Sequence, residues 1–156
     1  MKKIVLLLSF AFLIFACKSN PVTNLDRKSQ VEIKGNWKIT TVTYIGQEYF
    51  KVNAFQIADT KCFEGSTWKF ISNNNKGEMT LNAAGCTTFS SPIVWSINEQ
   101  GMFGMKIVNA GMKAKKVLEG YYLKVENQTA TSFQLIDKMD VGGKMSDIVY
   151  QFEKIN

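Results

Sequence analysis

The chain has 156 residues, long enough for one domain with a core, with 19 Lys and Arg against 13 Asp and Glu and a formal net charge of +6 at pH 7. It has no histidine, the most common general base and a frequent zinc ligand, so an enzyme, a metal site and a bound cofactor are disfavoured. The basic residues are spread along the chain and form no dense Lys/Arg run with interleaved aromatics, which argues against nucleic acid as a partner.

The first 16 residues have the pattern of a secretion signal. Lys2 and Lys3 precede a mostly apolar run that is shorter than the roughly 17–25 residues a membrane-spanning helix needs. The sequence Leu13-Ile14-Phe15-Ala16-Cys17 resembles the lipobox of bacterial lipoproteins. This resemblance implies removal of residues 1–16 and attachment of lipid to the Cys17 thiol. The alternative is an ordinary cleaved signal with an incidental cysteine.

Residues 17–34 would then comprise the lipidated cysteine and a tether, because 18–34 are polar and show no firm periodicity. Leu25, Val31 and Ile33 are the apolar residues that could dock the tether back onto the domain. Two or more acyl chains hold a protein stably on a membrane. Lys18 stands where an aspartate commonly retains lipoproteins at an inner membrane. We therefore expect an outer-membrane lipoprotein of the cell envelope, facing either the periplasm or the outside.

From Gly35 onward, apolar and polar residues alternate with the period of two that is typical of strands. Asn and Gly clusters, such as 73–77 and 140–144, mark turns between them. Short strands joined mostly by tight turns predict an all-β fold over residues 35–156, an eight-stranded antiparallel up-and-down β-barrel. The predicted strands are 36–45, 66–72, 77–83, 91–98, 101–108, 117–126, 130–137 and 146–155.

With Cys17 acylated, Cys62 and Cys86 are the pair left to form a disulfide, which an exported protein permits. A hairpin turning at residues 73–76 pairs Trp68 with Leu81 and Phe70 with Met79. Extending this register brings the two cysteines to within one residue of opposite each other, so the predicted hairpin and the predicted disulfide agree.

Gly35-Asn36-Trp37 at the start of the first strand resembles the Gly-x-Trp signature of lipocalins. Together with the lipobox, the cysteine pair and the last strand, it makes the chain similar to bacterial lipocalin-like lipoproteins. The resemblance implies that Trp37 plugs the closed base of the barrel, with Gly35 beside it. Lipocalins usually stack an arginine of the last strand on this tryptophan, and Lys154 stands as the substitute cation here.

Two functions remain open. In the first, a monomeric barrel binds or carries a small hydrophobic ligand, with the loops 47–63 and 109–116 gating the cavity. The alternative is a tethered interaction module that binds a protein or glycan through exposed Tyr49, Phe50 and Phe55. Large inward side chains either line a ligand cavity or simply fill the barrel. These candidate ligand-lining residues are Trp68, Phe70, Trp95, Phe133, Leu135, Tyr150 and Phe152.

Overall fold

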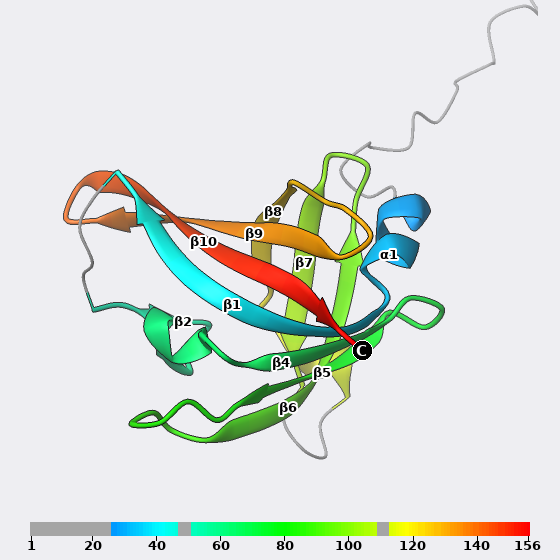
Figure 1. Cartoon of the computed structure of the whole chain (residues 1–156), viewed down its shortest axis with the longest axis horizontal. Coiled ribbons are helices and arrows are strands. Elements are labelled where there is room, and N and C mark those ends of the chain that lie inside the picture. The colour runs from blue at the N-terminus through cyan, green and yellow to red at the C-terminus, as the bar shows by residue number, and fades with distance from the viewer. Residues whose placement is uncertain (1–25, 47–50, 109–112) are drawn as a thin grey trace, which may run out of the picture.

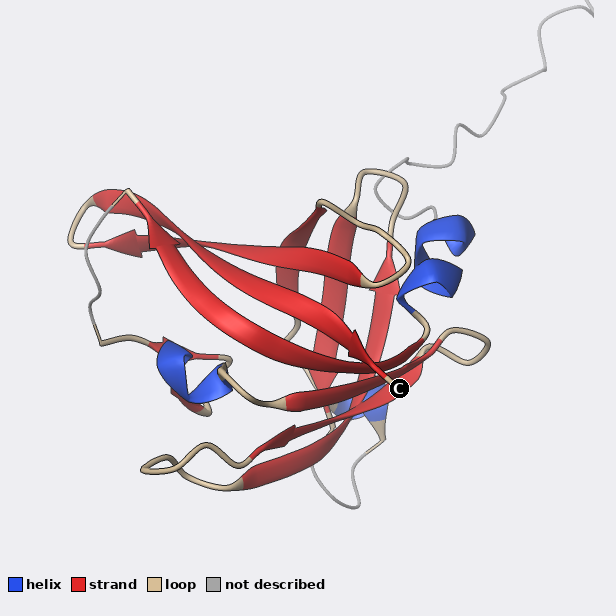
Figure 2. Ribbon diagram, in the orientation of Figure 1, coloured by secondary structure: helices blue, strands red, loops and turns tan. Residues whose placement is uncertain are grey.

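The computed structural model describes residues 26–46, 51–108 and 113–156 (Figure 1). Eight antiparallel strands form a closed barrel in the spatial order β1-β10-β9-β8-β7-β6-β5-β4, which confirms the predicted fold class (Figure 2). The predicted signal, Cys17 and residues 18–25 of the predicted tether lie outside the described residues. The barrel strands are β1 (Gly35–Ile45), β4 (Thr67–Ile71), β5 (Lys76–Leu81), β6 (Phe89–Ile97), β7 (Met102–Ile107), β8 (Tyr121–Glu126), β9 (Ser132–Val141) and β10 (Lys144–Ile155).

Most strand boundaries fall close to the predicted ones, and the largest differences lie at one end of the barrel. β8 begins at Tyr121 rather than at 117, after a short 3₁₀ helix, η4 (Ala114–Lys116). β9 and β10 extend beyond their predicted limits because a tight turn connects them at Gly142 and Gly143, whose φ values are 62° and 84°. Glycine adopts such positive φ values without steric cost, so the hairpin continues to the turn itself.

The predicted register of the β4–β5 hairpin is wrong by two residues. Trp68 pairs with Met79, and Phe70 pairs with Gly77. The turn closes earlier than predicted, because Asn75 takes a positive φ of 56° and the Asn74 side chain accepts a hydrogen bond from the Lys76 N–H at 3.1 Å. Gly77 is therefore a strand residue, and a Cβ there would lie 2.4 Å from the Lys69 carbonyl oxygen. A shift of two residues keeps every side chain on its predicted face.

Side chains that alternate along the strands meet inside the barrel and form its core. Burying one large apolar side chain stabilises a fold by about 1.5–3 kcal/mol, so this core is the main source of stability. The largest fully buried side chains are Trp37, Trp95, Tyr150, Phe63, Phe70, Phe103, Phe133, Phe152, Ile33, Ile39, Met79 and Leu81.

A short helix, α1 (Arg27–Ile33), lies at the end of the barrel that also holds the chain's C-terminus (Figure 1). The prediction of an irregular tether is wrong for these residues. The Asp26 carboxylate caps the helix by accepting a hydrogen bond from the Ser29 N–H at 3.1 Å, and the Asp26 N–H donates to the Ile97 carbonyl at 2.8 Å. Ile33 is fully buried, whereas Val31 is exposed. Within the described residues, neither α1 nor any other helix has the length and apolarity needed to cross a membrane.

The residues that the lipocalin resemblance assigns to the barrel base lie together. The Trp37 side chain is fully buried, and its indole N–H donates to the Ile33 carbonyl at 2.6 Å. The Lys154 ammonium lies 5.3 Å from the centre of the indole ring, within the range of a cation–π contact. Gly35 has a φ of 128°, and a Cβ there would lie 3.2 Å from Lys154 Cε. Trp37 therefore joins α1 to the barrel.

Candidate functional site

The opposite end of the barrel is covered by a segment that connects β1 to β4. We call residues 51–66 the cap segment. It contains a two-residue strand pair, β2 (Asn53–Ala54) and β3 (Ala58–Asp59), followed by a 3₁₀ helix, η3 (Thr60–Phe63). Phe55 and Gln56, in the turn between β2 and β3, have φ values of 51° and 56°. Bulky residues rarely adopt this left-handed region, so packing rather than backbone preference holds the turn.

The predicted disulfide is present in the structure. Cys62 of η3 is bonded to Cys86, in the loop between β5 and β6, with a Cα–Cα distance of 5.7 Å. The bond fixes the far end of the cap segment to the neighbouring hairpin.

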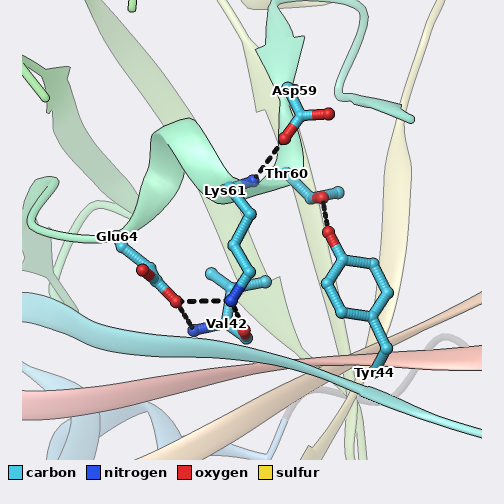
Figure 3. Close-up of polar contacts among 6 residues, drawn as sticks. All are labelled: Val42, Tyr44, Asp59, Thr60, Lys61 and Glu64. Carbon is cyan, nitrogen blue, oxygen red and sulfur yellow. Dashed lines mark hydrogen bonds and ion pairs between the residues drawn. The ribbon is translucent and has the colours of Figure 1, made fainter. Parts of the chain in front are cut away.

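A second attachment joins the cap segment to β1 through Val42 (Figure 3). β1 pairs with β4 only from Gly35 to Lys38, so the backbone of Val42 has no strand partner on that edge. The Glu64 carboxylate accepts a hydrogen bond from the Val42 N–H at 2.8 Å, and the Lys61 ammonium donates to the Val42 carbonyl. Lys61 and Glu64 also form an ion pair at 2.8 Å. The Lys61 and Glu64 side chains thus supply the hydrogen bonds that a neighbouring strand would otherwise make with the backbone of Val42.

Polar contacts continue along the same side of the cap segment (Figure 3). The hydroxyls of Tyr44, on β1, and Thr60 are hydrogen-bonded to each other. Asp59 accepts a hydrogen bond from the Lys61 N–H at 2.9 Å, which caps η3. Backbone hydrogen bonds join the cap segment to β1 at Ile39, which donates to the Ser66 carbonyl at 3.0 Å and accepts from the Gly65 N–H at 2.8 Å. Beyond Ile39, the contacts between the cap segment and β1 described above are made by side chains of the cap segment.

Glu64→Gln should weaken this attachment in a pH-dependent way. Burial raises the pKa of Glu64, but hydrogen bonds from Lys61 and Val42 outweigh it and leave the pKa below the ordinary value of 4.5. Its ionised form therefore stabilises the fold above pH 4.5, and this contribution is lost as pH falls through the lower folded-state pKa. Because the pair is partly exposed, we expect the variant to lose about 0.5–1 kcal/mol at pH 7 in urea unfolding, and less at pH 3 than at pH 7.

The matched control is Glu126→Gln, which breaks an exposed ion pair with Lys124 away from the cap segment. It should change the free energy of unfolding less than Glu64→Gln does at pH 7. A deficit of the Glu64 variant that is equally large at pH 3 and pH 7 would contradict the assigned role of its carboxylate.

A pocket of about 340 Å³ lies where the cap segment meets the barrel rim. Phe89 of β6, Ile107 of β7 and Tyr121 of β8 contribute its barrel side, each in phase with the inward residues of its strand. Phe55 and Ile57 contribute the cap side. We call this the mouth pocket; its lining is completed by Gln56, Thr87, Val117 and Glu119.

Phe55 separates the mouth pocket from the deeper core. Its side chain is 8% exposed, and its ring centre lies 5.2 Å from that of Tyr121 and 5.8 Å from that of Tyr150. The Tyr121 hydroxyl donates to the Phe55 carbonyl at 2.9 Å, which fixes the turn over the pocket. A buried Phe55 is not the exposed anchor that the interaction-module alternative requires; Tyr49 and Phe50 lie outside the described residues.

The seven residues predicted to line a ligand cavity are brought together inside the barrel, where they pack against one another. The ring centres of Phe133 and Phe152 are 4.5 Å apart, and those of Phe70 and Trp95 are 5.0 Å apart. All seven are buried, and none lines the mouth pocket. These contacts favour the filled-barrel alternative for these residues, except for the hydroxyl of Tyr150, which has no hydrogen-bond partner among the described residues.

Sequence reasoning missed the pocket-lining positions, although a signal for them was present. Phe89 is in phase with Ile93 and Trp95, but the predicted strand began two residues after it. Ile107 and Tyr121 fell inside predicted strands without being recognised as rim residues. Among the described residues, no group of three or more Asp, Glu or Cys side chains is placed to hold a metal ion.

The barrel, the Trp37 base and the capped mouth together define a lipocalin-type architecture. Residues 33–136 match the lipocalin-like domain family, and the chain therefore belongs to this family. No curated protein matches the sequence.

Solved structures of similar shape include a lipocalin-like protein from Bacteroides uniformis, 12% identical, with a TM-score of 0.49 over 80% of this chain and 99% of that one. An uncharacterised protein from Bacteroides eggerthii is 10% identical, with a TM-score of 0.46 over 78% and 98%. Bovine odorant binding protein, in complex with a selenium-containing odorant, is 10% identical, with a TM-score of 0.45 over 81% and 73%.

Proposed function

We propose that the protein is a binding protein of the cell envelope that holds a small hydrophobic ligand in the mouth pocket. The observation that carries this proposal is the pocket itself. Its volume of about 340 Å³ lies at the lower end of the range for small-molecule sites, about 300–1,000 Å³. Six of its nine lining side chains are apolar or aromatic, and the other three, Gln56, Thr87 and Glu119, are polar. Small-ligand sites combine apolar and aromatic walls with a few polar groups that orient the ligand.

Binding is tested with N-phenyl-1-naphthylamine, an uncharged dye whose fluorescence rises in apolar surroundings. We expect saturable binding with one dye per protein. Ile107→Trp places a larger side chain into the pocket and should weaken dye binding at least tenfold, a change of about 1.4 kcal/mol. Tyr122→Trp is the matched control, because Tyr122 is exposed on the outer wall of β8.

The Tyr122 variant should bind the dye as the unmodified protein does. Non-saturable binding, or equal loss of affinity in both variants, would contradict the proposed site. Circular dichroism of each variant verifies that the barrel is intact.

The second part of the proposal is that acylated Cys17 anchors this domain to the outer membrane. It is supported by the signal pattern of residues 1–16 and by Lys18 after the cysteine. Cys17→Ser should move the protein from the membrane fraction to the soluble fraction of the envelope, because the thiol that accepts lipid is gone. Lys18→Ser, its neighbour, should leave the protein membrane-bound. Membrane association that survives Cys17→Ser would exclude this anchor.

A further inference from the structure

One carboxylate interrupts the apolar interior of the barrel. Along β9, Phe133 and Leu135 are buried inside, and the same alternation turns Asp137 inward. Asp137 pairs across the sheet with Ile148, which is fully buried. Asp137 is half-buried, burial raises the pKa of its carboxyl, and no hydrogen bond or ion pair joins it to another described residue. A half-buried carboxylate among apolar side chains is poorly solvated, so a cation or a hydrogen-bond donor placed beside it would be favourable.

A buried hydroxyl without a partner faces the same region. Tyr150 of β10 is 1% exposed, and its hydroxyl forms no hydrogen bond within the described residues. Burial raises the pKa of Tyr150 well above its ordinary value, and the nearby charge of Asp137 raises it further. Tyr150 pairs with Leu135, the inward residue two positions before Asp137, so Asp137 and Tyr150 are diagonal neighbours on the inner face of β9 and β10. Buried polar groups are nearly always hydrogen-bonded, so the unsatisfied Tyr150 hydroxyl beside the half-buried Asp137 carboxyl indicates a binding position.

The surroundings favour a cation over an anion. Asp59 of the cap segment also raises the pKa of Tyr150 through its charge. Lys61 could offset these charges, but its ammonium is already bonded to Glu64 and to the Val42 carbonyl. Among the described residues that line the mouth pocket, Glu119 is the charged one, and the nearby Lys106 ammonium is bonded to the Val117 carbonyl at 3.0 Å. A fatty-acid carboxylate would meet like charges at both places, at a cost in binding free energy.

Phe55 stands between the mouth pocket and this polar pair. Its ring contacts Tyr121, which lines the pocket, and Tyr150, which belongs to the pair. Its left-handed backbone is not a conformation that phenylalanine prefers. A ligand that displaces the Phe55 ring can thus extend from the pocket to the pair.

We propose that Asp137 and Tyr150 are the polar end of the ligand site and that they select a hydrophobic amine. In this arrangement the hydrocarbon part lies in the mouth pocket, and the protonated amine donates hydrogen bonds to the Asp137 carboxylate and the Tyr150 hydroxyl oxygen. Hydrogen bonds between opposite charges in a dry site are the strongest available to such a ligand. This inference rests on the proposed function, since it assigns the ligand class to the same site.

The test compares decylamine, decanol and decanoate as competitors of N-phenyl-1-naphthylamine, each below its micelle concentration. The unmodified protein should bind decylamine at least tenfold more tightly than decanoate, with decanol between them. Asp137→Asn should weaken decylamine binding about tenfold and remove most of this preference. Asp147→Asn is the matched control, because Asp147 is on the outer face of β10, paired with Lys138. It should leave the preference unchanged.

Tyr150→Phe gives a second variant that does not endanger the fold. Removing an unpaired buried hydroxyl should leave the melting temperature unchanged or raise it, while decylamine binding weakens severalfold. Equal or tighter binding of decanoate, or a preference that survives Asp137→Asn, overturns the inference while dye and decanol binding still support the site. If dye, decanol and decylamine all fail to bind, the proposed function and this inference both fall.

Discussion

Trp37→Ala is expected to lower the free energy of unfolding by about 3–5 kcal/mol, the usual cost of replacing a buried large aromatic by alanine. Three contacts are lost together. The indole packs edge-on against Phe133 at 4.7 Å, its N–H holds the Ile33 carbonyl at the end of α1, and its face lies under Lys154. Since domains of this size are stable by about 5–15 kcal/mol, the variant should be close to unfolding at 37 °C.

Urea unfolding followed by tryptophan fluorescence measures this change, because Trp68 and Trp95 remain as buried reporters. Lys154→Met is the matched control. This variant removes the ammonium from the face of the Trp37 indole but keeps an apolar side chain beside it. The free energy of unfolding should fall by about 0.5–1 kcal/mol or less. A similar loss in the free energy of unfolding for Trp37→Ala and Lys154→Met would contradict the structure. It would mean that the stability of the barrel base does not depend on burial of the indole.

Replacing both Cys62 and Cys86 by serine is expected to lower the free energy of unfolding by about 3.5 kcal/mol. The disulfide closes a loop with a sequence separation of 24 residues, and the chain-entropy model assigns about this value to a loop of that length. The loss should be concentrated in the cap segment, since its other contacts with β1 are two backbone hydrogen bonds at Ile39 and partly exposed side-chain contacts. Dye affinity should therefore fall along with stability.

The measurement is urea unfolding and dye titration of the double variant beside the unmodified protein, each with and without dithiothreitol. Reductant should destabilise the unmodified protein to the level of the variant and leave the variant unchanged. A variant that unfolds at the same urea concentration as the oxidised protein would show that the bond does not hold the cap segment in place.

The fold could be predicted largely from the sequence because alternation fixes which face of a strand is buried. Trp37 and Lys154 were predictable because a short signature and the last strand mark the barrel base. Helix α1 was not, because seven residues with only Gln30 and Ile33 buried give too short a periodic pattern. The β4–β5 register failed because three consecutive asparagines and Gly77 offer more than one place to turn.

The site was harder to predict than the fold. Alternation identifies inward residues, but it does not show how far along the barrel each one lies or whether neighbours fill the space beside it. Trp68 and Phe152, chosen for their size, therefore belong to the packed core, whereas the pocket lies at Phe89 and Ile107, nearer the rim. Asp137 was overlooked because it was the last residue of a predicted strand. A polar residue is common where a strand ends in a turn, so nothing marked Asp137 as an inward residue.

Proton–nitrogen NMR of the labelled protein during titration with N-phenyl-1-naphthylamine tests the central claim most directly, since it locates the ligand. We expect the largest shifts at the backbone amides of Phe55, Phe89, Ile107 and Tyr121. The indole N–H signals of Trp37 and Trp68, bonded to Ile33 and Ser66, should move little. Dominant shifts at those indoles, or on the outer faces of the strands, would place the ligand elsewhere and contradict a binding site at the mouth.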